Sequence, residues 1–274
     1  MGVSAEAPIG PEGPIGQAGP IGEGDPFGEG GQAASISAHT SALASATPTF
    51  GHSTRWAAKL QAESVRAAQR CPDVDRVLPG GVAPPSDIRE AALSAALRDF
   101  DELRRLDMGA LAQTLGVSRS TLYRQAGDRD NLLGQAIWWR SRMSYALVLD
   151  ETSEMLGLER LNAAIGAVVR RYQGTPQIRR FIDEEPQAAM RILTGPTGHI
   201  QRGFITVTRN LLELEIEKDD LHFSIPPATL AYAIVRLIES FMYSDVLAVR
   251  EPDIEVGIEV VRSLLAGALT ARQT

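Results

Sequence analysis

The sequence is poor in the residues that build disulfides and metal sites. Cys71 is the only cysteine, which excludes an internal disulfide and a site made of several thiolates. The four histidines are scattered and lack the spacing of a metal-ligand motif. Asp219, Asp220 and His222 stand close together, but a polar loop between helices explains them better than a metal site does. We therefore expect neither a metal nor a cofactor.

Long apolar runs and signatures of catalysis are absent as well. No stretch approaches the roughly 20 apolar residues of a membrane-spanning helix. Met1 is followed by an acidic, glycine-rich stretch instead of the basic start and apolar centre of a secretory signal, so we expect a cytoplasmic protein. The sequence shows no Gly-rich phosphate loop, nucleophile elbow or paired-carboxylate signature. These absences predict a protein that is not an enzyme.

Charge is unevenly distributed along the chain. The formal net charge is −7, and residues 1–52 contain five acidic residues and no lysine or arginine. Residues 104–142, in contrast, carry seven arginines against three aspartates, a net charge of +4. A basic zone on an acidic chain is typical of a small DNA-binding region attached to a larger module. A solvated helix face is the alternative, and charge alone does not separate the two.

The N-terminal third of the chain has the composition of a tail and linker. Residues 1–52 are rich in Gly, Pro, Ala and Ser, and they cannot bury enough apolar surface to offset the entropy of ordering. Residues 53–70 are alanine-rich, and a weakly helical linker is favoured over a basic arm for the DNA backbone. Prolines and glycines then follow up to Pro85. We predict a disordered tail and linker over residues 1–85.

From Ser86 onward the pattern is helical, which predicts an all-α fold. Apolar residues recur three or four positions apart, and no alternating stretch of convincing length indicates a strand. Asp87 and Glu90 form a capping box for the first helix, and later prolines fall between the apolar-periodic stretches. We expect a helix-turn-helix domain over 86–128 and a helical ligand-binding and dimerisation domain over 129–274. Within the second domain the predicted helices are 129–150, 154–173, 177–184, 187–194, 197–218, 227–249 and 253–270.

The stretch that begins at Asp107 has the spacing of a helix-turn-helix. Asp107 can cap a first helix, and Gly116 suits the left-handed conformation at which that helix ends. Ser118 can cap a second helix, whose Leu122 faces back onto the first. Ala112 is small enough to let the two helices cross closely. The second helix of such a motif enters the major groove of DNA.

The exposed side of the second helix carries hydroxyl and guanidinium groups, which phosphates and base edges require. Ser118 and the Tyr123 hydroxyl would position phosphates, and Arg119 or Gln125 would read a guanine or adenine edge. The alternative is an ordinary polar helix face in a helical protein-interaction module. The predicted DNA-binding residues on this helix are Ser118, Arg119, Ser120, Thr121, Tyr123 and Arg124.

Residues 111–124 read Leu-Ala-x-x-Leu-Gly-Val-Ser-x-x-Thr-Leu-Tyr-Arg, which resembles the DNA-binding domain of the TetR family of repressors. Residues 88–100 resemble that family's first helix, and residues 129–132 resemble the start of its fourth. Members usually carry a bulky aromatic residue where this chain has Ala126, so we expect Trp138 or Trp139 to fill that space. The resemblance implies backbone contacts from Thr121, Tyr123 and Arg129, and contacts nearer the bases from Arg119, Ser120 and Arg124.

The resemblance also implies a function and partners. It predicts a homodimeric repressor that binds a double-stranded DNA operator and is released from it by a small-molecule effector. The alternatives are a ligand-independent DNA-binding activator and a helical protein-interaction module. Two apolar stripes in the final helices suit a four-helix dimer interface, with an internal core as the alternative. These stripes are Leu230, Ile234, Leu237, Ile238 and Phe241, and Ile254, Ile258, Val261, Leu265 and Ala268.

The effector-binding residues are not fixed by any motif. Polar groups among the apolar helices are the candidates, and nearby aromatic residues would form a wall. Residues 181–186 resemble a branch of the family linked to quorum-signal degradation, which implies a neutral lactone or its acid as the ligand. The polar candidates are Arg179, His199, Arg202, Tyr232, Glu239 and Tyr243, and the wall candidates are Trp138, Trp139 and Met143.

Overall fold

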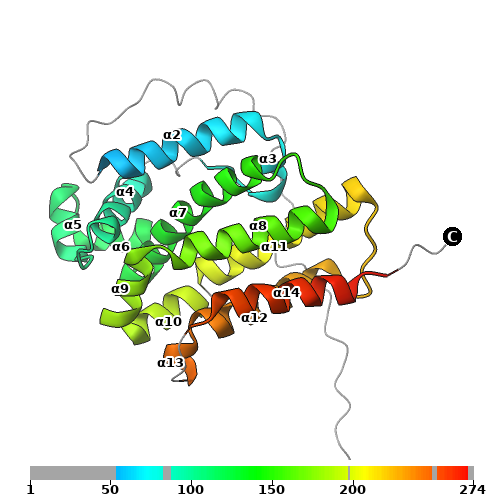
Figure 1. Cartoon of the computed structure of the whole chain (residues 1–274). Helices are drawn as coiled ribbons and strands as arrows, with labels where there is room; N and C mark the ends of the chain where they lie inside the picture. Colours follow the sequence, from blue (N-terminus) through cyan, green and yellow to red (C-terminus); the bar gives the residue numbers. More distant parts are fainter. Residues whose placement is uncertain (1–53, 83–87, 197, 249–251, 271–274) are drawn as a thin grey trace, which may run out of the picture. The chain divides into compact units, whose positions relative to one another are not determined.

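The computed structural model describes residues 54–82, 88–196, 198–248 and 252–270. The predicted disordered tail over residues 1–52 and the predicted cap at Asp87 lie outside these residues. Within them every regular element is a helix, and one isolated antiparallel bridge joins Phe223 to Leu269 (Figure 1). The all-α prediction is confirmed. No helix in the described ranges is long and apolar enough to cross a membrane.

Two helices precede the position at which we expected the fold to begin. They are α2 (Thr54–Arg70) and α3 (Asp73–Val77), and α2 packs along α7. Leu60 and Ala67 of α2 are buried, and so is Cys71 between the two helices. The prediction of a linker is therefore wrong for residues 54–82. The alanines hide the buried stripe in the sequence, because small side chains contribute little apolar contrast yet allow close helix packing.

The region predicted to bind DNA consists of three helices. They are α4 (Ile88–Asp101), α5 (Met108–Thr114) and α6 (Arg119–Ala126). Helix α6 packs against both α4 and α5. Two residues after α4 ends, Leu103 adopts a left-handed conformation with φ of 58°, and the Arg104 N–H donates to the Asp99 carbonyl at 2.7 Å.

The remaining helices lie close to their predicted ranges. Prolines open three of them, as expected from the fixed φ of proline and its missing N–H. The predicted helix 227–249 is divided in two at Tyr243. The observed helices are α7 (Arg129–Glu151), α8 (Gly157–Gln173), α9 (Pro176–Glu184), α10 (Pro186–Thr194), α11 (His199–Asp219), α12 (Pro227–Met242), α13 (Ser244–Ala248) and α14 (Ile254–Ala268).

Helix α7 is the element that touches both predicted regions. It begins directly after α6 and packs against α4, and further along it packs against α2, α8 and α11 (Figure 1). Helices α12 and α14 pack against each other, α11 covers α12, and α14 covers α8. A rigid helix of 23 residues thus connects the short helices at one end with the larger helical region.

A buried charge cluster joins three of these helices. Arg160 of α8 is fully buried, and its Nη1 donates to Asp73 of α3 at 2.7 Å and to Glu215 of α11 at 2.8 Å. Lys218 donates to the same Asp73 at 2.7 Å. A second Glu215 oxygen accepts from the Gly157 N–H at 2.8 Å. Buried charges are tolerated when they are paired and hydrogen-bonded in this way.

The two apolar stripes predicted for a dimer interface lie mainly inside the chain. Leu230, Ile234 and Leu265 have exposures of at most 1 %, and most other stripe members are also buried in the core. The interface interpretation of these stripes is wrong, because α11 and α8 of the same chain cover the faces on which they lie. A periodic apolar stripe shows that a helix face is buried, but it does not identify the element that buries it.

Candidate DNA-binding surface and ligand pocket

Local hydrogen bonds start both helices of the helix-turn-helix, and a glycine follows the first of them. The Asp107 carboxylate accepts from the Gly109 and Ala110 N–H groups at 2.6 and 3.0 Å. These bonds, chiefly the one from Ala110, hold the pKa of Asp107 below its usual value. Gly116 has a φ of 66°, and Ser118 accepts from the Thr121 N–H at 3.1 Å. The three capping residues expected from the sequence therefore act as caps.

The packing that orients α6 is as expected at Leu122 and Ala112, but the expectation for the two tryptophans is wrong. Leu122 is completely buried, and Ala112 and Ala126 are almost completely buried. Neither tryptophan proposed to fill the space at Ala126 is free to do so. Trp138 lies edge-on to Phe204 with ring centroids 5.4 Å apart, and Trp139 donates to the Val82 carbonyl at 3.1 Å.

The opposite face of α6 presents polar side chains to solvent. Tyr123 is 48 % exposed, and Arg119, Ser120 and Arg124 are exposed beside it. At the start of the helix, the Ser118 hydroxyl lies 2.9 Å from that of Ser120 and 2.8 Å from that of Thr121. Six of the seven predicted residues are thus gathered on one short helix and its cap.

Arg129 is placed differently from the other six. Its Nη2 donates to Glu185, between α9 and α10, at 2.7 Å, and its Nε donates to the Leu106 carbonyl at 3.2 Å. The side chain is only 21 % exposed. In this arrangement Arg129 ties the beginning of α7 to the α9–α10 junction and does not extend the exposed face of α6.

Several arginines of the basic zone, residues 104–142, have partners within the chain. Arg140 pairs with the buried Asp101 at 3.3 Å, and Arg142 donates to backbone carbonyls in residues 79–81. Arg119 and Arg124 remain exposed on α6 and make no ion pair within the part of the chain that the structure describes. Two arginines available for phosphates therefore lie on the exposed face of α6, whereas Arg105, at 78 % side-chain exposure, lies 3.7 Å from Glu185.

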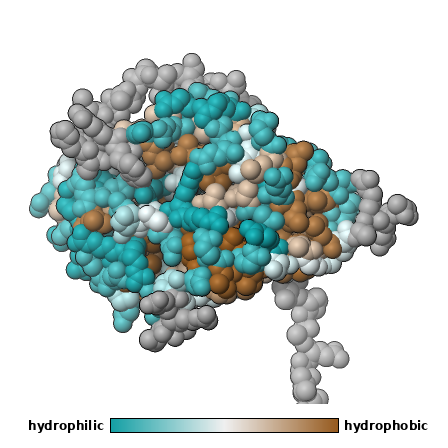
Figure 2. Space-filling model, viewed as in Figure 1, coloured by the Kyte–Doolittle hydropathy of each residue, from teal (hydrophilic) through white to brown (hydrophobic). Residues whose placement is uncertain are grey.

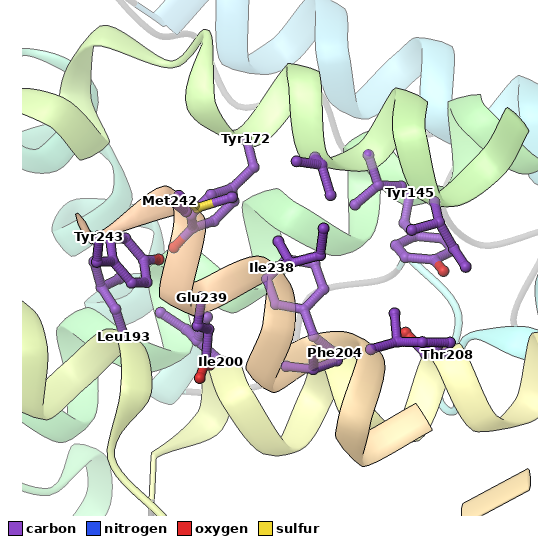
Figure 3. A pocket seen from close by; sticks show the side chains of 15 residues that line it. Tyr145, Tyr172, Leu193, Ile200, Phe204, Thr208, Ile238, Glu239, Met242 and Tyr243 are labelled. Atoms are coloured by element: carbon purple, nitrogen blue, oxygen red, sulfur yellow. The ribbon is translucent and has the colours of Figure 1, made fainter. Parts of the chain in front are cut away.

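A cavity of about 550 Å³, its open mouth included, lies among α7, α8, α10, α11 and α12 (Figure 3). Aliphatic and aromatic side chains form most of its surface. The lining residues are Tyr145, Ile165, Val168, Val169, Tyr172, Leu193, Ile200, Phe204, Thr208, Ile234, Val235, Ile238, Glu239, Met242 and Tyr243.

The polar groups of the cavity gather at its two ends. At one end Tyr145 bonds to Thr208, and burial raises the pKa of Tyr145. At the other end the hydroxyls of Tyr172 and Tyr243 point towards each other (Figure 3). The Tyr172 hydroxyl is buried and has no hydrogen bond of normal geometry.

Glu239 lies at the same end as the two tyrosines. Gln201 donates to both of its carboxylate oxygens at 3.1 and 3.0 Å, and Arg236 donates to one of them at 2.6 Å. Burial raises the pKa of Glu239, although Gln201 and Arg236 oppose that shift. The carboxylate is thus held by donors from the protein itself.

The sequence identified few of the cavity residues. Of the polar candidates, Glu239 and Tyr243 line the cavity, whereas Tyr232 is 54 % exposed and Arg179 pairs with Asp183 and Asp245 outside it. His199, Arg202, Trp138, Trp139 and Met143 are not among the lining residues either. The sequence missed Tyr145, Tyr172 and Thr208, because a polar atom on an otherwise apolar helix face carries no sign of the cavity it faces.

Comparisons with known families match both regions. Residues 156–266 match the family model described as "Tetracyclin repressor-like, C-terminal domain". Residues 83–138 match the model described as "Antitoxin Xre-like helix-turn-helix domain". The second match includes the helix-turn-helix formed by α5 and α6. No curated protein matches the chain at a significant level.

Solved structures give the more complete likeness. The transcriptional repressor QsdR of R. erythropolis, from the TetR family, is 27 % identical and has a TM-score of 0.61. The match covers 69 % of this chain and all of that one. The TetR-family repressor AlkX from Dietzia sp. strain DQ12-45-1b, implicated in biodegradation of n-alkanes, is 20 % identical over 68 % of this chain and 99 % of its own, with a TM-score of 0.48. The C-terminal family match and the likeness to QsdR show that the chain is similar to the TetR family of transcriptional repressors.

Proposed function

We propose that this protein is a homodimeric repressor that leaves its DNA operator when a small apolar or amphipathic molecule fills the cavity. The observation that carries the DNA-binding part is the exposed polar face of α6, with Arg119, Tyr123 and Arg124 on a helix fixed by Ser118 and Leu122. Such a face supplies both phosphate and base-edge contacts in the major groove. The similar protein QsdR, a transcriptional repressor, supports repression as the outcome.

A dimer is part of the proposal because two recognition helices must reach successive major grooves about 34 Å apart. Exposed apolar residues on α12 and α14 support a surface for the second copy. Tyr232 is 54 % exposed, Val256 44 % and Val260 37 %, and hydrophobic atoms reach the surface around α14 (Figure 2). Helices from two copies would pack as a four-helix bundle. This surface replaces the buried stripes that the sequence suggested.

The contacts of α7 and α10 offer a physical route from the cavity to the DNA. Helix α7 carries Tyr145 at the cavity, and its first residue, Arg129, directly follows the helix-turn-helix. Helix α10 carries Leu193 at the cavity, and its Arg191 pairs with Asp130 of α7 at 2.7 Å. A ligand that moves α10 or α7 therefore changes the position of α6. The coupling free energy is the difference in ligand affinity between the two arrangements.

Selection of genomic fragments by the full-length protein at physiological salt tests this function. We expect a small set of fragments that share a palindrome with half-sites one helical turn apart, together with a dimer in sedimentation. The Val260→Asp variant should weaken the dimer, and Glu259→Asp should leave it intact as the neighbouring control. Recovery of random, salt-sensitive fragments alone would contradict specific regulation. Specific binding that activates transcription from the recovered site would favour the activator alternative.

A further inference from the structure

The cavity's lining restricts the charge of any ligand. No lysine, arginine or histidine is among the lining residues that the structure describes, and Glu239 is the single ionisable acid there. An anionic ligand would lose its hydration, gain no cation and lie near a carboxylate, which is strongly unfavourable in an apolar site. A carboxylic acid in its ionised form is therefore a poor fit.

Glu239 does not make the cavity a cation site either. Arg236 already supplies a positive partner at 2.6 Å, and Gln201 supplies donors to both oxygens. An ammonium group would have to displace these bonds or enter beside a neutralised pair. The electrostatic gain is then too small to compensate for the hydration free energy that the cation loses.

Among the polar groups that line the cavity, the Tyr172 hydroxyl indicates most clearly which ligand group the cavity would bind. Tyr172 is only 9 % exposed, and its hydroxyl has no hydrogen bond of normal geometry. It points into the cavity beside the Tyr243 hydroxyl, while aliphatic groups such as Ile238 and Met242 lie next to both (Figure 3). Buried polar groups without a partner are uncommon in folded proteins, and an unmade bond is costly.

We infer that the cavity takes an uncharged, largely aliphatic molecule with one hydrogen-bond-accepting oxygen, and that Tyr172 donates to this oxygen. Medium-chain alcohols, ketones, esters and lactones share this chemistry. The aliphatic part lies along the middle of the cavity, towards Val168 and Phe204. The inference rests on the proposed role of this cavity as the ligand site, but it does not depend on DNA binding.

Isothermal titration calorimetry with the full chain and no DNA tests this inference. The probes are octan-1-ol, octanoate and octylamine, which share one chain and differ in the charge of the head group. We expect octan-1-ol to bind at least about tenfold more tightly than either charged probe at neutral pH. Tyr172→Phe keeps the ring and removes the donor, so octan-1-ol affinity should fall about three- to tenfold.

Two controls keep the result interpretable. Thr114→Ala removes a hydroxyl from an exposed side chain of α5, outside the cavity, and should leave every affinity unchanged. Val168→Phe fills part of the cavity and should abolish octan-1-ol binding, with circular dichroism confirming that the helices remain. Equal or tighter binding of octanoate or octylamine, an unchanged affinity in Tyr172→Phe, or no binding of any probe would each overturn the inference.

A DNA measurement separates this inference from the proposed function. If octan-1-ol binds as expected but leaves the selected operator bound, the ligand class stands and release by the effector is contradicted. If the operator is bound specifically while the calorimetry fails, the DNA-binding function stands and the ligand class is wrong.

Discussion

The helix-turn-helix and the cavity are built in opposite ways from the same chain. The first consists of two short helices fixed by neighbours in sequence, such as Ser118 with Thr121, and it exposes its polar groups. The second is assembled from five helices far apart in sequence, and it hides its polar groups at the ends of an apolar space. A DNA-reading surface is thus a local property of the sequence, whereas a ligand cavity is a property of the assembled core. The two should therefore respond differently to mutation.

The largest effect is expected at the buried charge cluster around Arg160. Arg160→Met leaves Glu215 and part of the Asp73 charge buried without their partner, and the free energy of unfolding should fall by about 3–5 kcal/mol. Urea unfolding followed by circular dichroism measures this loss. Arg170→Ala on the same helix breaks only an exposed pair with Glu255 and should change stability by less than about 1 kcal/mol. A loss of similar size in both variants would contradict this account of the core.

Helix α6, which we propose reads DNA, should show the reverse pattern, with a loss of DNA binding and no loss of folding. Arg119→Ala should weaken operator binding by about 1–3 kcal/mol, roughly ten- to a hundredfold, in fluorescence anisotropy. Its thermal unfolding should match that of the unmodified chain, because Arg119 is exposed and unpaired in the described ranges. Arg76→Ala, which changes an exposed arginine on α3 paired with Glu217, is the matched control and should bind DNA normally. Unchanged binding in Arg119→Ala would remove α6 from the interface.

The ion pair between Asp101 of α4 and Arg140 of α7 lies where the helix-turn-helix region meets the larger helical region, and its carboxyl group can titrate. Burial raises the pKa of Asp101, at the end of α4, to about 6, although its ion pair with Arg140 of α7 opposes the shift. The folded state therefore holds a proton that the unfolded state releases near pH 4. Stability contributed by this group is present below about pH 4 and is lost as the pH rises through about 6, by about 1.4 kcal/mol for each unit by which the folded pKa exceeds the unfolded one.

Asp101→Asn tests that sign, since an amide does not titrate. Unfolding free energies between pH 4 and pH 6.5 should fall less steeply with pH in Asp101→Asn than in the unmodified chain. Asp183→Asn, which changes an exposed carboxylate paired with Arg179, should keep the original slope. Identical slopes in all three proteins would show that Asp101 is ionised in the folded state across this range.

The smallest effect is expected at the end of α4. Leu103 has a φ of 58° and a side chain that is 37 % exposed, a conformation that glycine adopts without strain. Leu103→Gly should raise the unfolding free energy by about 0.5–1 kcal/mol, since relief of the backbone strain exceeds the lost apolar contact. Leu156→Gly, at an exposed leucine with φ of −134°, should instead lower it. Destabilisation by Leu103→Gly would mean that its side-chain contacts outweigh the strain.

What the sequence predicted follows the same division between local and assembled structure. Asp107, Gly116 and Ser118 were identifiable because a cap acts within about three residues of itself. Prolines likewise marked the starts of α9, α10 and α12. At these positions residues that are adjacent in sequence determine the backbone conformation, so the conformation can be predicted from the sequence alone.

The features that the sequence did not reveal all depend on contacts with residues distant in sequence. The contact of Arg129 with the DNA backbone stays a prediction, but the sequence did not reveal its partner in the chain, Glu185, which is more than fifty positions away. Tyr172 looked like any core tyrosine, because its role depends on space left between α8, α11 and α12. The stripe through Ile234 indicated burial correctly and gave no indication of the helix that buries it.

The central claim is that α6 reads a specific DNA sequence, and one comparison of affinities tests it most directly. Fluorescence anisotropy of the full chain at physiological salt should show at least about a thousandfold tighter binding to the selected operator than to a scrambled duplex of equal length. Equal affinity for the two duplexes, falling in parallel as salt is raised, would contradict the claim and leave only non-specific attraction to phosphate.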